Sequence, residues 1–128
     1  FLKAMGMKIG RHAFVNTEYI SDPQLITLGD DAALGGSVRI FAHYGGGGSF
    51  VVAPVVVERR ATIGLGATIM GDVEVGEGAT VLPHSVLLPG SRVGPGETWG
   101  GVPARRIPRE EMERFKDGIR GARTVELP

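Results

Sequence analysis

Eight apolar residues recur at a constant interval of six positions through the second half of the chain: Val57, Ile63, Ile69, Val75, Val81, Leu87, Val93 and Trp99. A small or β-branched residue follows each of the first six by four positions: Ala61, Ala67, Val73, Ala79, Ser85 and Ser91. This period is neither the 3.6 residues of a helix nor the alternation of two in an isolated strand. Short repeats of this kind are typical of a parallel β-helix, in which each hexapeptide forms one flat side of a coiled solenoid.

The first half of the chain carries the same repeat with one interruption. Its apolar positions stand before and after a slip of one residue near residues 21–23: Ile9, Val15, Leu28, Leu34 and Ile40. The slip predicts a small insertion at a corner, since Pro23 has no N–H to donate to a sheet ladder. We expect one β-helix domain over residues 1–107.

The hexapeptides stop near Pro108, which precedes a pair of acidic residues and suits a helix N-terminus. Apolar residues then recur at helical spacing: Met112, Phe115 and Ile119. We expect residues 108–128 to form a short C-terminal capping α-helix, packed on the last coil or on a neighbouring subunit, followed by an irregular tail.

The period breaks between Ile40 and Val57, which are 17 residues apart where the next side of the solenoid needs six. About eleven residues must therefore leave the wall, and we expect a loop at about residues 42–54. Residues 45–49 read Gly-Gly-Gly-Gly-Ser, which is identical to a common engineered linker. The segment is interpreted either as a natural flexible loop or as a loop shortened by design.

Composition narrows the class of protein. The 128 residues suit a single domain, and 14 basic and 14 acidic side chains give a net charge of zero, which argues against a nucleic-acid partner. The chain has no cysteine, so it holds no disulfide or thiolate metal site, and a cytoplasmic location is the default expectation. No apolar run is long enough to span a bilayer. The first residue is Phe1 and not Met, which suggests a trimmed chain.

His43 is the main candidate for chemistry. It follows a predicted strand over residues 38–41 and precedes the loop, so it should lie at a corner near the surface. Imidazole exchanges protons near neutral pH and is a common general base. The competing interpretation is a solvated corner histidine without a function.

Two segments resemble the hexapeptide-repeat acyltransferases. Residues 100–107 read Gly-Gly-Val-Pro-Ala-Arg-Arg-Ile and are similar to the closing G-G-x-P-A-[KR]-x-I motif of that family. Residues 28–31 and 38–43 resemble the turn and strand that precede its catalytic histidine. The chain is thus similar to the maltose, galactoside and xenobiotic O-acetyltransferases. It also resembles the C-terminal β-helix regions of polylysine-synthetase-type peptide synthetases, especially along residues 17–35.

This resemblance implies a left-handed parallel β-helix that forms a homotrimer, with acetyl-CoA or another acyl-CoA in a groove between subunits. It implies that His43 is the general base in acyl transfer to the hydroxyl or amine of a small-molecule acceptor. No metal is expected, and direct transfer is favoured because the chain has no cysteine to carry the acyl group.

The candidate binding residues fall into two groups, in which the resemblance places Asn16, Arg105 and Arg106. The acceptor side comprises Asn16, Glu18 and Tyr44, and Glu18 is expected to orient His43. The acyl-CoA side comprises Gly64, Leu65, Pro83, His84, Arg105 and Arg106. Backbone N–H groups near Gly64 would stabilise an oxyanion, and the two arginines would bind the CoA phosphates. Without the motif, both arginines are surface charges that flank the helix, and His84 is a structural or solvated corner residue.

Two alternatives from other classes stay open. A non-catalytic trimerising β-helix, as part of a larger synthetase or membrane protein, needs the same core and the same glycines. A zinc protein similar to the γ-class carbonic anhydrases would need its three histidines together, although His12, His43 and His84 are 31 and 41 residues apart.

Overall fold

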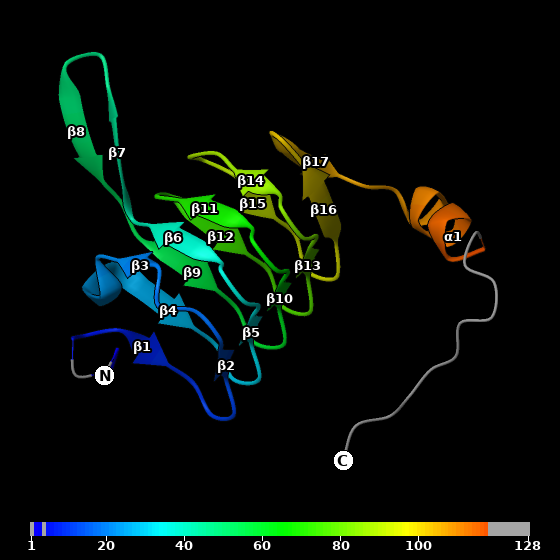
Figure 1. The fold of residues 1–128 in the computed structure, drawn as a ribbon, viewed down its shortest axis with the longest axis horizontal. Helices are drawn as coiled ribbons and strands as arrows, with labels where there is room; N and C mark the ends of the chain where they lie inside the picture. Colours follow the sequence, from blue (N-terminus) through cyan, green and yellow to red (C-terminus); the bar gives the residue numbers. More distant parts are fainter. Residues whose placement is uncertain (1, 4, 118–128) are drawn as a thin grey trace.

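The computed structural model describes residues 2, 3 and 5–117, and the expectations for Ile119 and the irregular tail lie outside them. The described chain winds as a left-handed parallel β-helix through three sheets (Figure 1). Sheet A contains β1 (Lys8–Ile9), β4 (Ile26–Leu28), β9 (Val55–Val57), β12 (Val73–Val75) and β15 (Arg92–Val93). Sheet B contains β2 (Phe14–Val15), β5 (Ala33–Leu34), β10 (Thr62–Ile63), β13 (Thr80–Val81), β16 (Thr98–Gly101) and β17 (Ala104–Arg106). Sheet C contains β3 (Ile20–Ser21), β6 (Arg39–Phe41), β11 (Thr68–Met70) and β14 (Val86–Leu87).

Each coil visits the three sheets in the order A, B, C, so one full turn takes three hexapeptides. Val57 pairs with Val75 and Val75 with Val93 in sheet A, which fixes the pitch at 18 residues. In sheet B, Ile63 pairs with Val81. The predicted six-residue period and the fold class are confirmed by this register.

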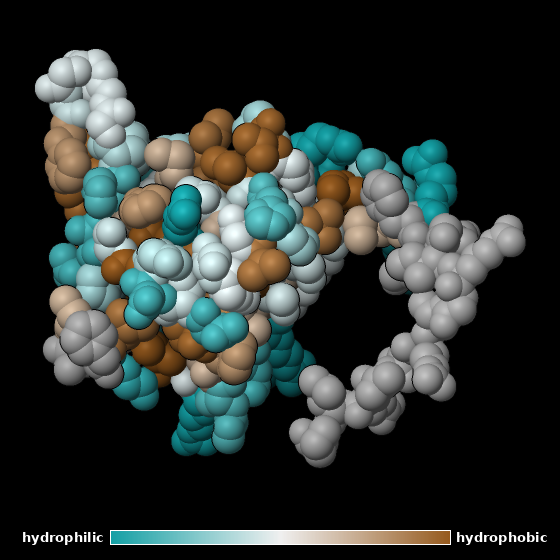
Figure 2. Space-filling model, in the orientation of Figure 1, coloured by the Kyte–Doolittle hydropathy of each residue, from teal (hydrophilic) through white to brown (hydrophobic). Residues whose placement is uncertain are grey.

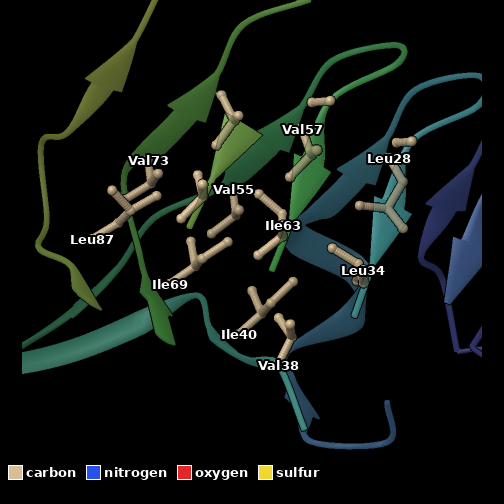
Figure 3. Close-up of a cluster of buried hydrophobic side chains, with 14 of the residues drawn as sticks. Leu28, Leu34, Val38, Ile40, Val55, Val57, Ile63, Ile69, Val73 and Leu87 are labelled. Atoms are coloured by element: carbon tan, nitrogen blue, oxygen red, sulfur yellow. The ribbon is translucent and has the colours of Figure 1, made fainter. Parts of the chain in front are cut away.

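The apolar repeat positions point inward and form the core (Figure 3). The labelled side chains of Leu34, Ile40, Ile63 and Ile69 face one another between the sheets. The small residues at the narrow corners are fully buried as well: Ala32, Ala61, Ala67, Ala79 and Ser85. Only small side chains fit there because the walls converge.

The predicted slip is a short 3-10 turn, η1 (Pro23–Leu25), between sheets C and A. Ile9 pairs with Leu28, whereas Ile20 pairs with Ile40. Relative to a strict six-residue period, the first coil is therefore one residue short before β3 and two residues long after it. This turn places Asp22 at the edge where sheet C meets sheet A.

The predicted loop takes the form of a β-hairpin. Strands β7 (His43–Gly46) and β8 (Ser49–Val52) pair in antiparallel fashion and project from the solenoid (Figure 1). The turn between them consists of Gly47 and Gly48, at φ of 55° and 79°. Two successive left-handed residues suit the twist of a two-residue hairpin turn, and glycine adopts them without steric cost.

The last coil is closed by β17, which runs antiparallel to β16 after a cis peptide bond between Val102 and Pro103. The helix α1 (Arg109–Asp117) follows. Arg105 pairs with Glu111 of this helix at 3.2 Å. No helix in the described part of the chain is both long and apolar enough to cross a membrane.

Candidate active site at the base of the hairpin

Two long edges of the solenoid contain the predicted site residues. The BC edge, between sheets B and C, comprises residues 16–19, 35–38, 64–67 and 82–85. The CA edge, between sheets C and A, comprises residues 22–25, 42–54, 71–72 and 88–91. His43 starts the hairpin and lies on the CA edge, while most of the other predicted residues lie on the BC edge.

The imidazole of His43 contacts the carboxylate of Asp22, with Nδ1 against Oδ2. The two residues are 21 positions apart but occupy the CA edge of adjacent coils. Both side chains are about one-third exposed, at 33% and 29%, so solvent and small molecules reach them. A carboxylate in this position accepts a hydrogen bond from the Nδ1–H group and so favours the tautomer in which Nδ1 carries the proton.

Asp22 reaches His43 because its backbone is left-handed, with φ of 59° and ψ of 52°. Aspartate tolerates this conformation better than most side chains do. The six-residue pattern gives no signal for Asp22, and Glu18 was the carboxylate expected to orient His43. Glu18 lies on the BC edge, and the carboxylate that contacts His43 is Asp22.

Two aromatic rings flank the imidazole. The ring of Phe50 stacks on it at a centroid distance of 5.2 Å and an interplanar angle of 27°. The ring of Phe41 meets it edge-on at 6.1 Å. These contacts restrict the orientation of the imidazole, so three side chains from two coils and the hairpin hold His43.

The pairing of the hairpin decides which residues share a face with His43. His43 pairs with Val52 and Gly45 with Phe50, so these four residues lie on one face. Tyr44 pairs with Val51 on the opposite face. The structure therefore does not bring Tyr44 beside the imidazole. The aromatic residue there is Phe50, which was not among the residues predicted from the sequence.

Asn16 and Glu18 line a groove of about 430 Å³ on the BC edge of the first two coils. Val15, Thr17, Tyr19, Gly36 and Ser37 complete its lining. The hydroxyl of Thr17 donates to the carbonyl of Val38 at 2.7 Å and ties the two coils together. The groove brings two predicted acceptor residues together, away from His43.

Four of the predicted acyl-CoA residues stack on the BC edge of the next two coils. The amide of His84 donates to the carbonyl of Leu65 at 2.9 Å. A methyl group built on Gly64 would lie 2.6 Å from the nitrogen of Pro83, so only glycine fits there. Gly64, Leu65, Pro83 and His84 thus form a single column.

Arg105 and Arg106 lie beyond this column on β17, and each already has an acidic partner. Arg106 pairs with Glu97 at 3.1 Å, and Arg105 pairs with Glu111. The pKa of Glu97 lies below its ordinary value, chiefly because its carboxylate accepts a hydrogen bond from the Gly94 amide, and further through Trp99 and Arg106. Both arginine side chains remain more than 60% exposed, at 62% and 64%.

The three histidines lie at three different edges of the solenoid. His12 is between sheets A and B, His84 is on the BC edge and His43 is on the CA edge. Within the residues that the structure describes, no three His, Cys, Asp or Glu side chains are grouped as metal ligands.

The fold and these motifs define a left-handed β-helix that resembles the hexapeptide-repeat acyltransferases, as residues 100–107 predicted. A solved hexapeptide-repeat containing acetyltransferase of Vibrio cholerae O1 biovar eltor, complexed with acetyl coenzyme A, superposes with a TM-score of 0.73 and 27% identity. The match covers 80% of this chain and 60% of that one.

Two curated proteins are also similar in sequence. The delta-poly-L-ornithine synthetase of Acinetobacter baumannii is 27% identical over 127 residues, and the mitochondrial gamma carbonic anhydrase 2 of Arabidopsis thaliana is 38% identical over 69 residues. The matches cover 93% and 52% of this chain, but only 9% of the synthetase and 25% of the anhydrase. The chain thus spans a small part of either relative. No family model matches it.

Proposed function

We propose that the chain is a CoA-dependent acyltransferase in which His43 is the general base and Asp22 its positioning residue. The observation that carries this proposal is the contact between Asp22 and His43 at the base of an exposed hairpin. The similarity to an acetyltransferase complexed with acetyl coenzyme A supports the class of substrate.

The contact determines which ring nitrogen is available. With Nδ1 donating to the ionised carboxylate of Asp22, Nε2 carries the lone pair that accepts a proton. Asp22 also stabilises the imidazolium once the proton has been taken up. Positioned proton transfer of this kind contributes about 10²–10⁴ in rate.

The transfer then proceeds in two steps. Nε2 of His43 removes the proton from the acceptor hydroxyl or amine as its oxygen or nitrogen attacks the thioester carbonyl, and a tetrahedral oxyanion forms. The oxyanion collapses, the C–S bond breaks, and the departing CoA thiolate takes the proton from His43. The products are the acylated acceptor and free CoA, and no cysteine in the chain can carry the acyl group.

The separation of the two edges supports a site shared between copies of the chain. Leu65 on the BC edge and Gly71 on the CA edge are six residues apart, and six extended residues span about 20 Å. A thioester on the column of Gly64, Leu65, Pro83 and His84 would meet a His43 only if the BC edge of one copy faces the hairpin of another. We propose a homotrimer with this arrangement, in which Arg105 and Arg106 bind the CoA phosphates after exchanging their acidic partners.

The decisive experiment is an acetyl-CoA assay that follows release of the CoA thiol with a thiol reagent. Because the chain has no cysteine, the reagent reports CoA alone. We expect His43→Ala to lower kcat by about 10²–10⁴. Asp22→Asn should lower kcat with little change in KM for acetyl-CoA, since it disturbs the ring and not binding. His12→Asn, at an exposed left-handed corner, is the matched control and should retain full activity.

Parallel assays with hydroxyl and amine acceptors distinguish O-acylation from N-acylation. If acetyl-CoA neither binds nor turns over, the proposal fails. The non-catalytic trimerising module, which the small share of the synthetase covered by this chain favours, would then replace it. Light scattering tests the trimer, and a monomeric chain that retains full activity would contradict the shared site.

A further inference from the structure

The AB edge, between sheets A and B, carries none of the predicted catalytic or binding residues. It comprises the turns at residues 10–13, 29–32, 58–61, 76–79 and 94–97. These turns run along the lower side of the molecule in Figure 1, and Figure 2 shows hydrophilic side chains there. The edge is therefore available for a role outside the proposed active site.

Charge alternates from coil to coil at the tips of these turns. The amide of the third residue of each turn donates to the carbonyl of the second residue in the preceding coil, at 2.8–3.0 Å. The second residues therefore stack directly, and the four charged ones, here called the tip column, are all exposed: Arg11, Asp30, Arg59 and Glu77. Their charges read plus, minus, plus, minus along the solenoid.

An alternating column of four charges is complementary to its own reverse. In an antiparallel contact between two copies, Arg11 of each meets Glu77 of the other, and Asp30 of each meets Arg59 of the other. Both columns advance by the strand spacing of about 4.8 Å per coil, so the pairs stay in step. A contact in the same direction would instead place like charges opposite one another. The pattern therefore fits a two-fold, self-complementary interface.

The third residues of the two central turns add to this pattern. Asp31 and Arg60 follow Asp30 and Arg59, so they also face each other across the same axis. Both have left-handed backbones, with φ of 59° and 60°, which strain a residue with a Cβ atom. Two later coils have glycine at the equivalent position, Gly78 and Gly96. The turn itself thus accepts glycine and does not require a charged side chain.

Contacts within the chain leave the central tip residues able to bind further partners. In the described part of the chain, the Asp30 carboxylate accepts from the Arg11 amide through Oδ1, and Arg59 pairs with Glu77 through Nε at 3.4 Å. Each group therefore retains further acceptors or donors. The other carboxylates of these turns lie beside the tips: Glu58 lines a hollow with Glu74 and Arg92, and Glu97 pairs with Arg106.

We propose that the AB edge binds the AB edge of a second copy of the chain in antiparallel fashion, about a two-fold axis between the coils of Asp30 and Arg59. Sheet C lies between the two edges that the proposed trimer uses, so the AB edge faces away from that contact. Exposed ion pairs are individually weak and are screened by salt. The Debye length is about 30 Å at 0.01 M salt and about 3 Å at 1 M, so the association depends on ionic strength.

Two charge exchanges test the contact without altering the net charge of the chain. Arg11→Asp with Asp30→Arg, and Arg59→Asp with Glu77→Arg, each place like charges opposite one another in the antiparallel arrangement. Light scattering at pH 8 compares the weight-average mass at about 0.01 M and about 1 M NaCl. We expect the mass of the wild type to be at least about twofold higher at low salt, and that of either exchanged variant to rise less than about 1.2-fold. An equimolar mixture of the two variants should recover at least about half of the wild-type rise, because their tip columns are complementary.

The matched control exchanges two exposed charges on α1, Glu110→Arg with Arg114→Glu, and should behave as the wild type does. A wild type that shows no rise, an exchanged variant that keeps it, or a mixture that stays dissociated would overturn the inference. The acetyl-CoA assay is a separate measurement, since this contact uses none of the proposed active-site residues.

Circular dichroism checks that each variant is folded. If an exchanged variant does not fold, Asp31→Gly with Arg60→Gly takes its place, because both turns accept glycine and the net charge is again unchanged. This variant should lower the wild-type rise in mass by at least about half, and an unchanged rise would equally reject the contact.

Discussion

Gly29 lies directly against the backbone of Arg59 in the next coil. A methyl group built on Gly29 would lie 2.3 Å from the Arg59 nitrogen, which is closer than Cβ atoms approach other atoms in proteins. The Gly29 amide donates to the carbonyl of Val57 at 2.7 Å, so the coils cannot separate to make room.

Gly29→Ala should therefore destabilise the chain by about 1–3 kcal/mol, the usual range for overpacking. Gly46→Ala, where an added methyl group meets nothing within 4 Å, should change stability by less than about 0.5 kcal/mol. Urea unfolding followed by circular dichroism measures both. Equal destabilisation by the two alanines would show that the coil spacing is not responsible.

Ile63 tests the packing of the core. Its side chain is 1% exposed and lies between Leu34 and Val81 in sheet B. Ile63→Ala should cost about 2–5 kcal/mol, because it removes buried methyl groups and leaves a cavity. Thr62→Ala, on the outward face of the same strand, should cost less than about 1 kcal/mol. A similar loss for both variants would contradict the inward orientation of the repeat.

Substituting glycine for two neighbouring arginines should change the stability of the fold in opposite directions. Arg60 has a φ of 60°, a conformation that strains residues with a Cβ atom. Arg60→Gly should relieve that strain and stabilise the chain by about 0.5–1 kcal/mol. Arg59 has an ordinary backbone and an exposed ion pair with Glu77, so Arg59→Gly should destabilise by about 0.5–1 kcal/mol. Thermal unfolding of the two variants measures these changes. If both melting temperatures shift in the same direction, the left-handed backbone of Arg60 is not a source of strain.

Glu97 should make stability depend on acidic pH. Folding lowers the pKa of Glu97 below its ordinary value of 4.5, mainly through the Gly94 amide and the Trp99 indole. Stability from the ionised carboxylate is therefore fully present above pH 4.5 and is lost as the pH falls through the lowered folded-state pKa. Wild type should exceed Glu97→Gln in urea midpoint at pH 7, and the difference should shrink in acid. A difference that stays constant down to pH 2 would rule out this linkage.

The period of six was sufficient to predict the solenoid, because which side chains point inward depends on local spacing alone. Val57, Ile63 and Ile69 follow one another around a coil with no reference to distant residues. The length of the inserted segment was also predicted from the sequence. Leu28 and Val57 pair although they are 29 residues apart, which is eleven residues more than one coil.

The arrangement around His43 was not accessible in the same way. Glycines at positions 45–48 resemble a linker, and only the left-handed turn at Gly47 and Gly48 reveals a hairpin and its register. The Asp22 contact depends on the relative height of two coils and on the displaced turn at η1. Glu18 was the carboxylate that the sequence pattern favoured, but it projects from the wrong edge.

Asp22, Asp72 and Gly90 occupy equivalent turns along the CA edge, all with left-handed backbones, and the hairpin replaces the turn that would lie between the first two. Each coil bonds only to its neighbours, so lengthening one turn leaves the others in register. The position of His43 along the axis of the solenoid can therefore change only in steps of one coil, about 4.8 Å each. Moving the inserted hairpin to the turn near Gly90 would shift His43 by two coils, about 10 Å, along the solenoid axis. Its neighbour on the preceding coil would then be Asp72 in place of Asp22.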